Sequence, residues 1–96
     1  MPIVKTVNYI DFDIKYNLIE SHLDHAPMRV TSRGHIWEKK IYNIYSKLLN
    51  KDDIVIDIGA YIGTHTLPMS KFSKKVYAFE ANPDIFCCLK QNVECN

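Results

Sequence analysis

IVIDIGAYIG, the sequence at residues 54–63, decides the fold class of this chain. Residues 54–58 form a β-branched run that is too short for a helix, and its apolarity predicts a strand covered on both faces, as in a parallel sheet. Gly59 and Gly63 predict a turn directly after this strand. We expect a helix at about residues 64–72, where Pro68 is tolerated because the first helical N–H groups have no internal partner.

A second strand and helix are predicted further along the chain. Residues 75–79, KVYAF, fit a strand. Asn82-Pro83-Asp84 is a strong helix start, with an N-cap asparagine, a proline at the first helical position and an acidic residue in the first turn. Residues 54–96 therefore indicate the α/β class: an incomplete Rossmann-like, doubly wound parallel sheet, limited to its first two strands and helices.

The preceding sequence is divided into an N-terminal extension, residues 1–35, and the α/β unit, residues 36–96. Within the extension, Ile10, Phe12 and Ile14 alternate with acidic residues, which predicts a half-buried strand. Residues 17–25 fit a short helix, and Pro27 and Gly34 predict irregular chain around them.

A longer helix is predicted over residues 36–49. Its apolar residues recur at helical spacing and form one stripe, which we interpret as core: Trp37, Ile41, Ile44, Tyr45 and Leu48. The polar residues 50–53 then end the pattern before the first strand of the sheet.

Composition limits the classes of partner. The formal net charge is +1, so no large field attracts nucleic acid or anionic lipid, and we expect neither as a partner. No apolar run approaches the ~20 residues of a membrane span, and residues 1–5 lack a signal-peptide pattern, so we expect a soluble cytoplasmic protein. The three cysteines form no C-x-x-C and a poor disulfide framework, and we interpret them as small apolar helix residues: Cys87, Cys88 and Cys95.

Asp57, the glycine turn and Glu80 form the constellation that carries chemistry. Glycines after the first strand let the backbone approach a ligand without an intervening Cβ. Glu80 follows the second strand, about 20 residues after Gly59, where a carboxylate suits the two hydroxyls of an adenosine ribose. The pattern predicts a nucleoside-cofactor site at the ends of both strands.

Tyr61 distinguishes between the possible cofactors. It occupies the position of the second glycine in the dinucleotide pattern G-x-G-x-x-G, where small size makes room for a pyrophosphate. S-adenosylmethionine has no phosphate and does not need that space. A P-loop is excluded because no Gly-Lys-Ser/Thr follows. The turn therefore favours S-adenosylmethionine, and a nicotinamide- or other nucleotide-binding unit is a distant alternative.

These residues resemble the FkbM-type methyltransferases. The resemblance covers about residues 34–96 and is most specific in three segments: residues 34–38, residues 57–68 and residues 76–83. It implies an S-adenosylmethionine-dependent enzyme in which Asp57 helps to hold the cofactor's amino group, Gly59 and Gly63 line its methionine and ribose, and Glu80 binds the ribose hydroxyls. The cofactor-binding set that it implies is Asp57, Gly59, Ala60, Tyr61, Gly63, Thr64, Glu80, Ala81 and Asn82.

The chain departs from the family pattern in two respects. Tyr61 stands where the family usually has asparagine, and the later strands that carry the acceptor site are absent. The resemblance implies O-methylation of a small-molecule or saccharide hydroxyl, and no residue is identified as the catalytic base. The alternative is a truncated, non-catalytic remnant or interaction module, with self-association through an open sheet edge.

The histidines have less specific interpretations. His65, beside the glycine turn, is a candidate base, but we interpret it as a surface or capping residue. His22 and His25 have i, i+3 spacing without a third ligand nearby in sequence, so we predict no metal site.

Overall fold

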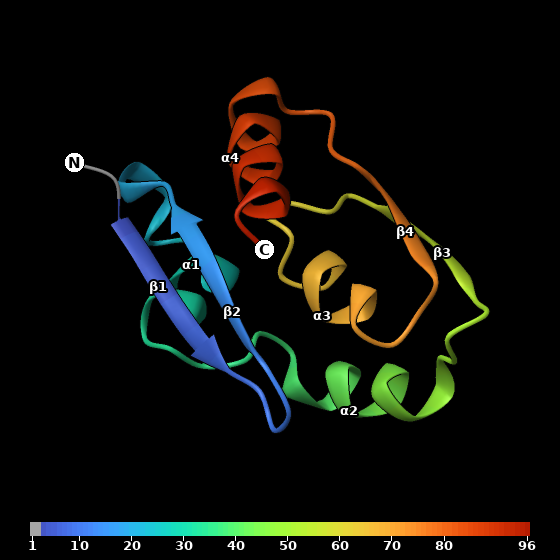
Figure 1. Cartoon of the computed structure of the whole chain (residues 1–96). Coiled ribbons are helices and arrows are strands. Elements are labelled where there is room, and N and C mark those ends of the chain that lie inside the picture. Colours follow the sequence, from blue (N-terminus) through green and yellow to red (C-terminus); the bar gives the residue numbers. More distant parts are fainter. Residues whose placement is uncertain (1–2) are drawn as a thin grey trace.

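A parallel pair of strands forms the centre of the C-terminal half (Figure 1). The computed structural model describes residues 3–96. Strand β3 (Ile54–Ile58) pairs in parallel with β4 (Lys75–Phe79), with Ile54 opposite Lys75 and Ile58 opposite Phe79. Helix α3 (Thr66–Ser70) connects the strands, and α4 (Pro83–Glu94) follows β4. The predicted α/β class and the order of these four elements are confirmed.

The start of α4 is the one that the sequence predicts. The side-chain oxygen of Asn82 accepts hydrogen bonds from the backbone N–H groups of Asp84, at 3.0 Å, and Ile85, at 3.3 Å. Pro83 occupies the first turn, where its missing N–H costs nothing. These caps fix where the chain leaves β4 and therefore where Glu80 lies.

The β3–β4 pair is covered on one face only. Figure 1 shows α3 and α4 on the same side of the pair. On the other side, alternate apolar residues of both strands are exposed to solvent: Ile54, Ile56, Ile58, Tyr77 and Phe79. The prediction of two-sided burial is therefore wrong for the part of the chain that the structure describes. Continuous apolarity shows that a strand suits burial on both faces, but it does not supply the second layer.

The N-terminal extension begins with an antiparallel hairpin. Strands β1 (Ile3–Asn8) and β2 (Asp13–Leu18) pair with Ile3 opposite Leu18 and Asn8 opposite Asp13. The predicted strand over residues 10–14 is wrong at its centre, because the backbone turns there: the Tyr9 N–H donates to the Phe12 carbonyl at 2.8 Å, and Ile10 is 90% exposed. The alternation is real but continues later in the chain, with Ile14, Tyr16 and Leu18 buried.

Residues 17–35 also differ from the prediction. The expected helix over residues 17–25 is replaced by the end of β2 and a single 3₁₀ turn, η1 (Glu20–His22). A helix, α1 (Ala26–Ser32), occupies the segment predicted to be irregular, with Pro27 in its first turn. Gly34 follows this helix with φ 78°, a conformation that suits glycine after a helix end.

Helix α2 (Lys39–Leu48) is shorter than predicted and buries a different face. Trp37 precedes the helix, and Ile41, Ile44 and Leu48 are exposed. The buried residues are Tyr42 and Tyr45. Tyr42 packs against aromatic rings of the hairpin turn and of the segment after α3, with its centroid 5.1 Å from Tyr9 and 6.0 Å from Phe72. Aromatic stacking with these segments, which the helix sequence does not encode, selects the tyrosine face.

One hydrophobic cluster joins the hairpin, α2 and α4. It contains Val7, Ile14 and Tyr16 from the hairpin, Tyr42 and Tyr45 from α2, and Ile85 and Cys88 from α4, among others. The hairpin therefore packs directly on elements of the α/β unit. Within residues 3–96, no helix has the length and apolarity that crossing a membrane would require.

Alkaline pH is expected to destabilise this cluster. Burial raises the pKa of Tyr9 to about 12 and also raises the pKa of Tyr16 and Tyr45. A raised pKa means that the folded state binds the proton more tightly, so this stability is complete below the unfolded pKa of about 10 and is lost as pH rises through the folded pKa. Denaturant unfolding should show a free energy of unfolding that is constant at neutral pH and falls above about pH 10. A free energy unchanged to about pH 12 would contradict the buried phenol cluster.

Cys87 and Cys88 are expected to differ in reactivity although they are neighbours. Cys87 is exposed, whereas Cys88 is buried and its thiol donates to the Asn17 carbonyl at 3.1 Å. Burial also raises the pKa of the Cys88 thiol, which lowers its thiolate fraction. Alkylation under native conditions, followed by peptide mass spectrometry, should label Cys87 at least about ten-fold faster than Cys88. Equal rates would show that α4 does not bury this face.

Candidate cofactor site

The turn after β3 has an unusual backbone. Gly59, Tyr61 and Gly63 all have positive φ, at 77°, 57° and 95°. Glycine adopts such values without steric cost, but tyrosine does so at a cost of about 1–2 kcal/mol. The N–H groups of Gly59 and Ala60 both donate to the Phe79 carbonyl, at 2.9 and 3.0 Å, which fastens the turn to the end of β4.

Glu80 lies directly against this turn. One of its carboxylate oxygens, Oε1, accepts a hydrogen bond from the Tyr61 N–H at 2.8 Å. The other, Oε2, accepts from the Asn82 N–H at 3.1 Å. The two parallel strands end at the same edge of the sheet, so residues that follow them meet although they are distant in sequence. The structure therefore brings Glu80 and the glycine turn together.

A cavity of about 200 Å³ opens at the turn. Five residues from the predicted cofactor-binding set line it: Asp57, Gly59, Ala60, Tyr61 and Thr64. Four others do not. Glu80 adjoins it through its bond to Tyr61, Gly63 lies buried under the turn against Leu89, Ala81 is exposed, and the Asn82 side chain caps α4.

Four further residues line the same cavity: Pro27, Trp37, Glu38 and His65. The imidazole Nε2 of His65 lies 2.8 Å from Glu38 Oε1, and its Nδ1 lies 3.2 Å from the Tyr45 hydroxyl. His65 is thus held on both ring nitrogens, and it does not cap α3 with its side chain. The interpretation of His65 as a surface or capping residue is therefore replaced by a role in the wall of the cavity.

The sequence offered only a weak signal for this group. Trp37 and Glu38 belong to the segment 34–38 that carries the family resemblance, but its spacing from the turn does not predict contact. Glu38 has φ 50°, and a left-handed glutamate beside a cavity is the kind of backbone strain that often accompanies a functional site.

Asp57 and Tyr61 face different surroundings. Asp57 Oδ2 accepts the Thr66 hydroxyl at 2.6 Å, which fixes the carboxylate and leaves Oδ1 as a further acceptor. The Tyr61 ring packs against the hydrophobic cluster, and burial raises the pKa of its hydroxyl. Among residues 3–96 that hydroxyl has no hydrogen-bond partner. Tyr61 therefore contributes to the core as well as to the cavity wall.

The chemistry of these groups fits a ligand with hydroxyl and ammonium donors. Asp57 and Glu38 line the cavity and Glu80 adjoins it, so three carboxylates surround the turn. At Gly59 a Cβ would meet nothing within 4 Å, which leaves open space beside the backbone. Such an arrangement suits the hydroxyls of a ribose and the amino group of a methionine moiety better than an anionic pyrophosphate.

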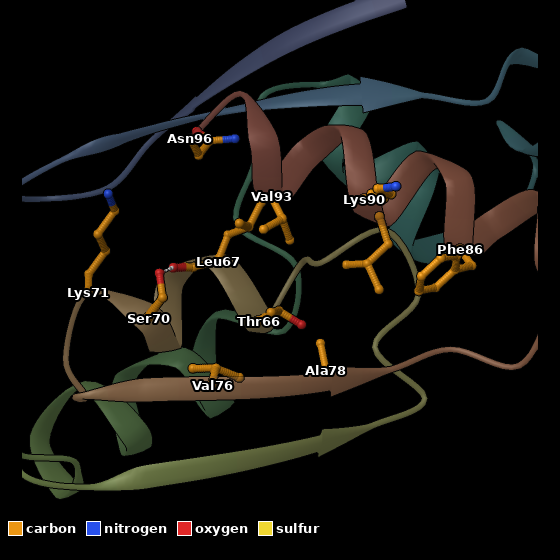
Figure 2. A pocket seen from close by; sticks show the side chains of 11 residues that line it. Thr66, Leu67, Ser70, Lys71, Val76, Ala78, Phe86, Lys90, Val93 and Asn96 are labelled. Carbon is orange, nitrogen blue, oxygen red and sulfur yellow. Dashed lines mark hydrogen bonds between the residues drawn. The ribbon is translucent and has the colours of Figure 1, made fainter.

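A larger cavity, of about 470 Å³, lies elsewhere, between α3, β4 and α4 (Figure 2). Its wall is mainly apolar, with Val76, Ala78 and Phe86 facing the space, and Lys71 and Lys90 are also among its lining residues. None of the predicted cofactor-binding residues lines it. The smaller cavity is the candidate site because the constellation of carboxylates and glycines is found there.

Comparison with known proteins places this site in a family. The model of the TRM5/TYW2 methyltransferase domain matches residues 32–96. This match includes α2, β3, the glycine turn and Glu80. It confirms the predicted class, a methyltransferase, and supports S-adenosylmethionine as the cofactor, but it does not support the FkbM family in particular.

Individual relatives include enzymes of different substrates. The tRNA(Phe) (4-demethylwyosine(37)-C(7)) aminocarboxypropyltransferase of Methanocaldococcus jannaschii is 39% identical over 67 residues, which are 68% of this chain and 26% of that protein. The probable ribosomal RNA small subunit methyltransferase A of Methanosphaera stadtmanae is 47% identical over 45 residues, 47% of this chain and 17% of that protein. The hexuronic acid methyltransferase AglP of Haloferax volcanii is 34% identical over 74 residues, 70% of this chain and 30% of that protein.

The prediction that nucleic acid plays no part is contradicted by these relatives, two of which are named for tRNA or ribosomal RNA. That prediction used the net charge of +1, but a sum over the whole chain does not report how charge is distributed on individual faces. The chain spans at most about a third of the length of these relatives, 17% to 30%. Because the family model matches more than half of its residues, the chain belongs to the TRM5/TYW2 methyltransferase domain family.

Proposed function

We propose that this chain forms the cofactor-binding part of an S-adenosylmethionine-dependent methyltransferase that acts on RNA. The observation that carries the proposal is the 2.8 Å contact between Glu80 Oε1 and the Tyr61 N–H, which places a carboxylate against the glycine turn. The cofactor supplies a methyl group already activated on a sulfonium, so the protein has to bind, orient and accept a proton.

Each carboxylate has a proposed role. Glu80 binds the two ribose hydroxyls: both of its oxygens already accept a backbone N–H, but each retains a further acceptor site. Asp57, fixed by Thr66, binds the amino group of the methionine moiety through its remaining oxygen. Gly59 provides the space for the ligand to approach the backbone.

Two groups at the cavity are able to accept a proton. The Glu38 carboxylate lines it and is held at 2.8 Å by the His65 imidazole, which in turn contacts the Tyr45 hydroxyl. A carboxylate oriented by a second side chain is suited to general base catalysis when the acceptor atom lies within hydrogen-bonding reach. We therefore assign the search for the catalytic base to this pair.

RNA is the acceptor class that the relatives favour, and a saccharide hydroxyl is the second candidate. Two of the three relatives described above are named for RNA. The third, named for a hexuronic acid, supports the O-methylation that the FkbM resemblance implies. A nicotinamide dinucleotide is disfavoured because Tyr61, with its left-handed backbone and bulky side chain, occupies the position where a pyrophosphate needs clearance.

Methyl transfer can distinguish these acceptors. The chain is incubated with S-adenosylmethionine labelled in its methyl group and with total tRNA, ribosomal RNA or a uronic acid oligosaccharide. We expect binding of the cofactor and label in an RNA fraction. Label only in the saccharide would replace RNA by the second candidate, and cofactor binding without transfer would favour the non-catalytic alternative. A chain that binds no S-adenosylhomocysteine would contradict the proposed function altogether.

A further inference from the structure

We infer that Asn92 is a positioning residue of the cofactor turn and that it connects this turn to the N-terminal hairpin. The inference rests on the proposed function, because the position of the turn affects activity only if the turn binds the cofactor. Asn92 lies on α4, on the side opposite the cavity shown in Figure 2, and was not among the residues that the sequence pointed to.

Asn92 is a wholly buried polar side chain that joins three segments. Its side chain is 0% exposed. Its Oδ1 accepts from the backbone N–H of Asn17 on β2 at 2.6 Å and from the Asn17 side-chain amide at 3.0 Å. Its Nδ2 donates to the Ile62 carbonyl in the cofactor turn at 2.8 Å and to the Asn17 carbonyl at 3.3 Å. Figure 1 shows α4 between the hairpin and the β3–β4 pair, as this bridge requires.

The bond to Ile62 holds the strained part of the turn. Tyr61, with φ 57°, is gripped on its amino side, where its N–H donates to Glu80. On its other side, the next carbonyl, that of Ile62, accepts from Asn92. A non-glycine residue keeps a left-handed conformation only where its surroundings over-determine it. Glu80 and Asn92 together provide that restraint.

Asn96 provides a matched control. It lies four residues later on the same side of the helix and makes the same pair of bonds to β2: its Oδ1 accepts from the Lys15 N–H at 3.0 Å and its Nδ2 donates to the Lys15 carbonyl at 2.8 Å. Both asparagines therefore tie the C-terminal helix segment to the open edge of β2. Only Asn92 also bonds to the turn, so the difference between the two variants isolates that bond.

The test compares Asn92→Ala with Asn96→Ala. Calorimetry measures the affinity for S-adenosylhomocysteine, and NMR measures hydrogen exchange of the Gly63 amide, whose N–H donates to the Ala60 carbonyl within the turn. We expect Asn92→Ala to weaken binding about ten-fold and to accelerate Gly63 exchange by at least about ten-fold, because an orphaned buried carbonyl frees the turn. Asn96→Ala should change either quantity less than about two-fold.

Two outcomes overturn the inference: an Asn92 variant with native affinity and native Gly63 exchange, or equal effects of both variants. If Asn92→Ala does not fold, Asn92→Ser, which leaves a smaller gap and a hydroxyl, is measured instead. If the unmodified chain binds no S-adenosylhomocysteine, the proposed function fails. The exchange rates then still decide whether Asn92 positions the turn.

Discussion

Replacing Glu80 by glutamine is expected to weaken S-adenosylhomocysteine binding by about 30- to 100-fold, the largest loss of affinity expected from one substitution. Two ribose hydroxyls that donate to a carboxylate form charge-assisted hydrogen bonds, and glutamine provides one oxygen and no charge. Its oxygen can still accept the Tyr61 N–H, so the turn itself should persist. Calorimetric titration of the purified chain measures the change directly.

Asp84→Asn is the matched control for Glu80→Gln. Asp84 is an exposed acidic residue in the first turn of α4, four positions after Glu80, and it does not line the cavity. The same change of charge there should alter the affinity less than about two-fold, since exposed charges are well screened. If Glu80→Gln binds as tightly as the unmodified chain, the ribose role of Glu80 is wrong.

Gly63→Ala is expected to cause the largest loss of stability, about 2–4 kcal/mol. A Cβ at this position would lie 3.1 Å from Leu89 Cδ1 and 3.4 Å from Leu67, and the backbone φ is 95°. Both backbone strain and overpacking therefore oppose the substitution. Denaturant unfolding, followed by far-UV circular dichroism, measures the free energy of unfolding.

Gly59→Ala separates the two causes. Its φ is 77°, but a Cβ there would meet nothing within 4 Å, so only backbone strain of about 1–2 kcal/mol should remain. The added methyl group would also enter the space beside the turn and should weaken cofactor binding more than it weakens folding. Equal losses of stability at both glycines would show that Gly63 does not pack against α4 as described.

Local signals were sufficient for the parallel strand pair. The strands at residues 54–58 and 75–79 and the start of α4 at Asn82-Pro83 depend on short-range propensity and capping, which the sequence expresses directly. The hairpin was mislocated because a period of two persists through residues 10–18 and does not state where the chain turns. In α2 both faces are apolar, so the choice of Tyr42 and Tyr45 over Ile41 and Ile44 depends on tertiary contacts.

The candidate site was predictable to the same extent. Glu80 meets the turn because parallel strands end at one edge, a consequence of topology that the spacing already implies. His65 and Glu38 were not recognised as partners, since 27 positions separate them and only the packing of α2 beside α3 joins them. Asn92 was missed for a similar reason: a buried amide at the end of an amphipathic helix has no signature until its partners are known.

An NMR titration of the ¹⁵N-labelled chain with S-adenosylhomocysteine tests most directly whether the bend and its neighbouring carboxylate form an adenosyl site. We expect saturable shifts centred on the amides of Gly59, Tyr61, Gly63 and Glu80, and little response to a nicotinamide dinucleotide. Shifts centred instead on Lys71 and Lys90, at the larger cavity, or a stronger response to the dinucleotide, would contradict the account.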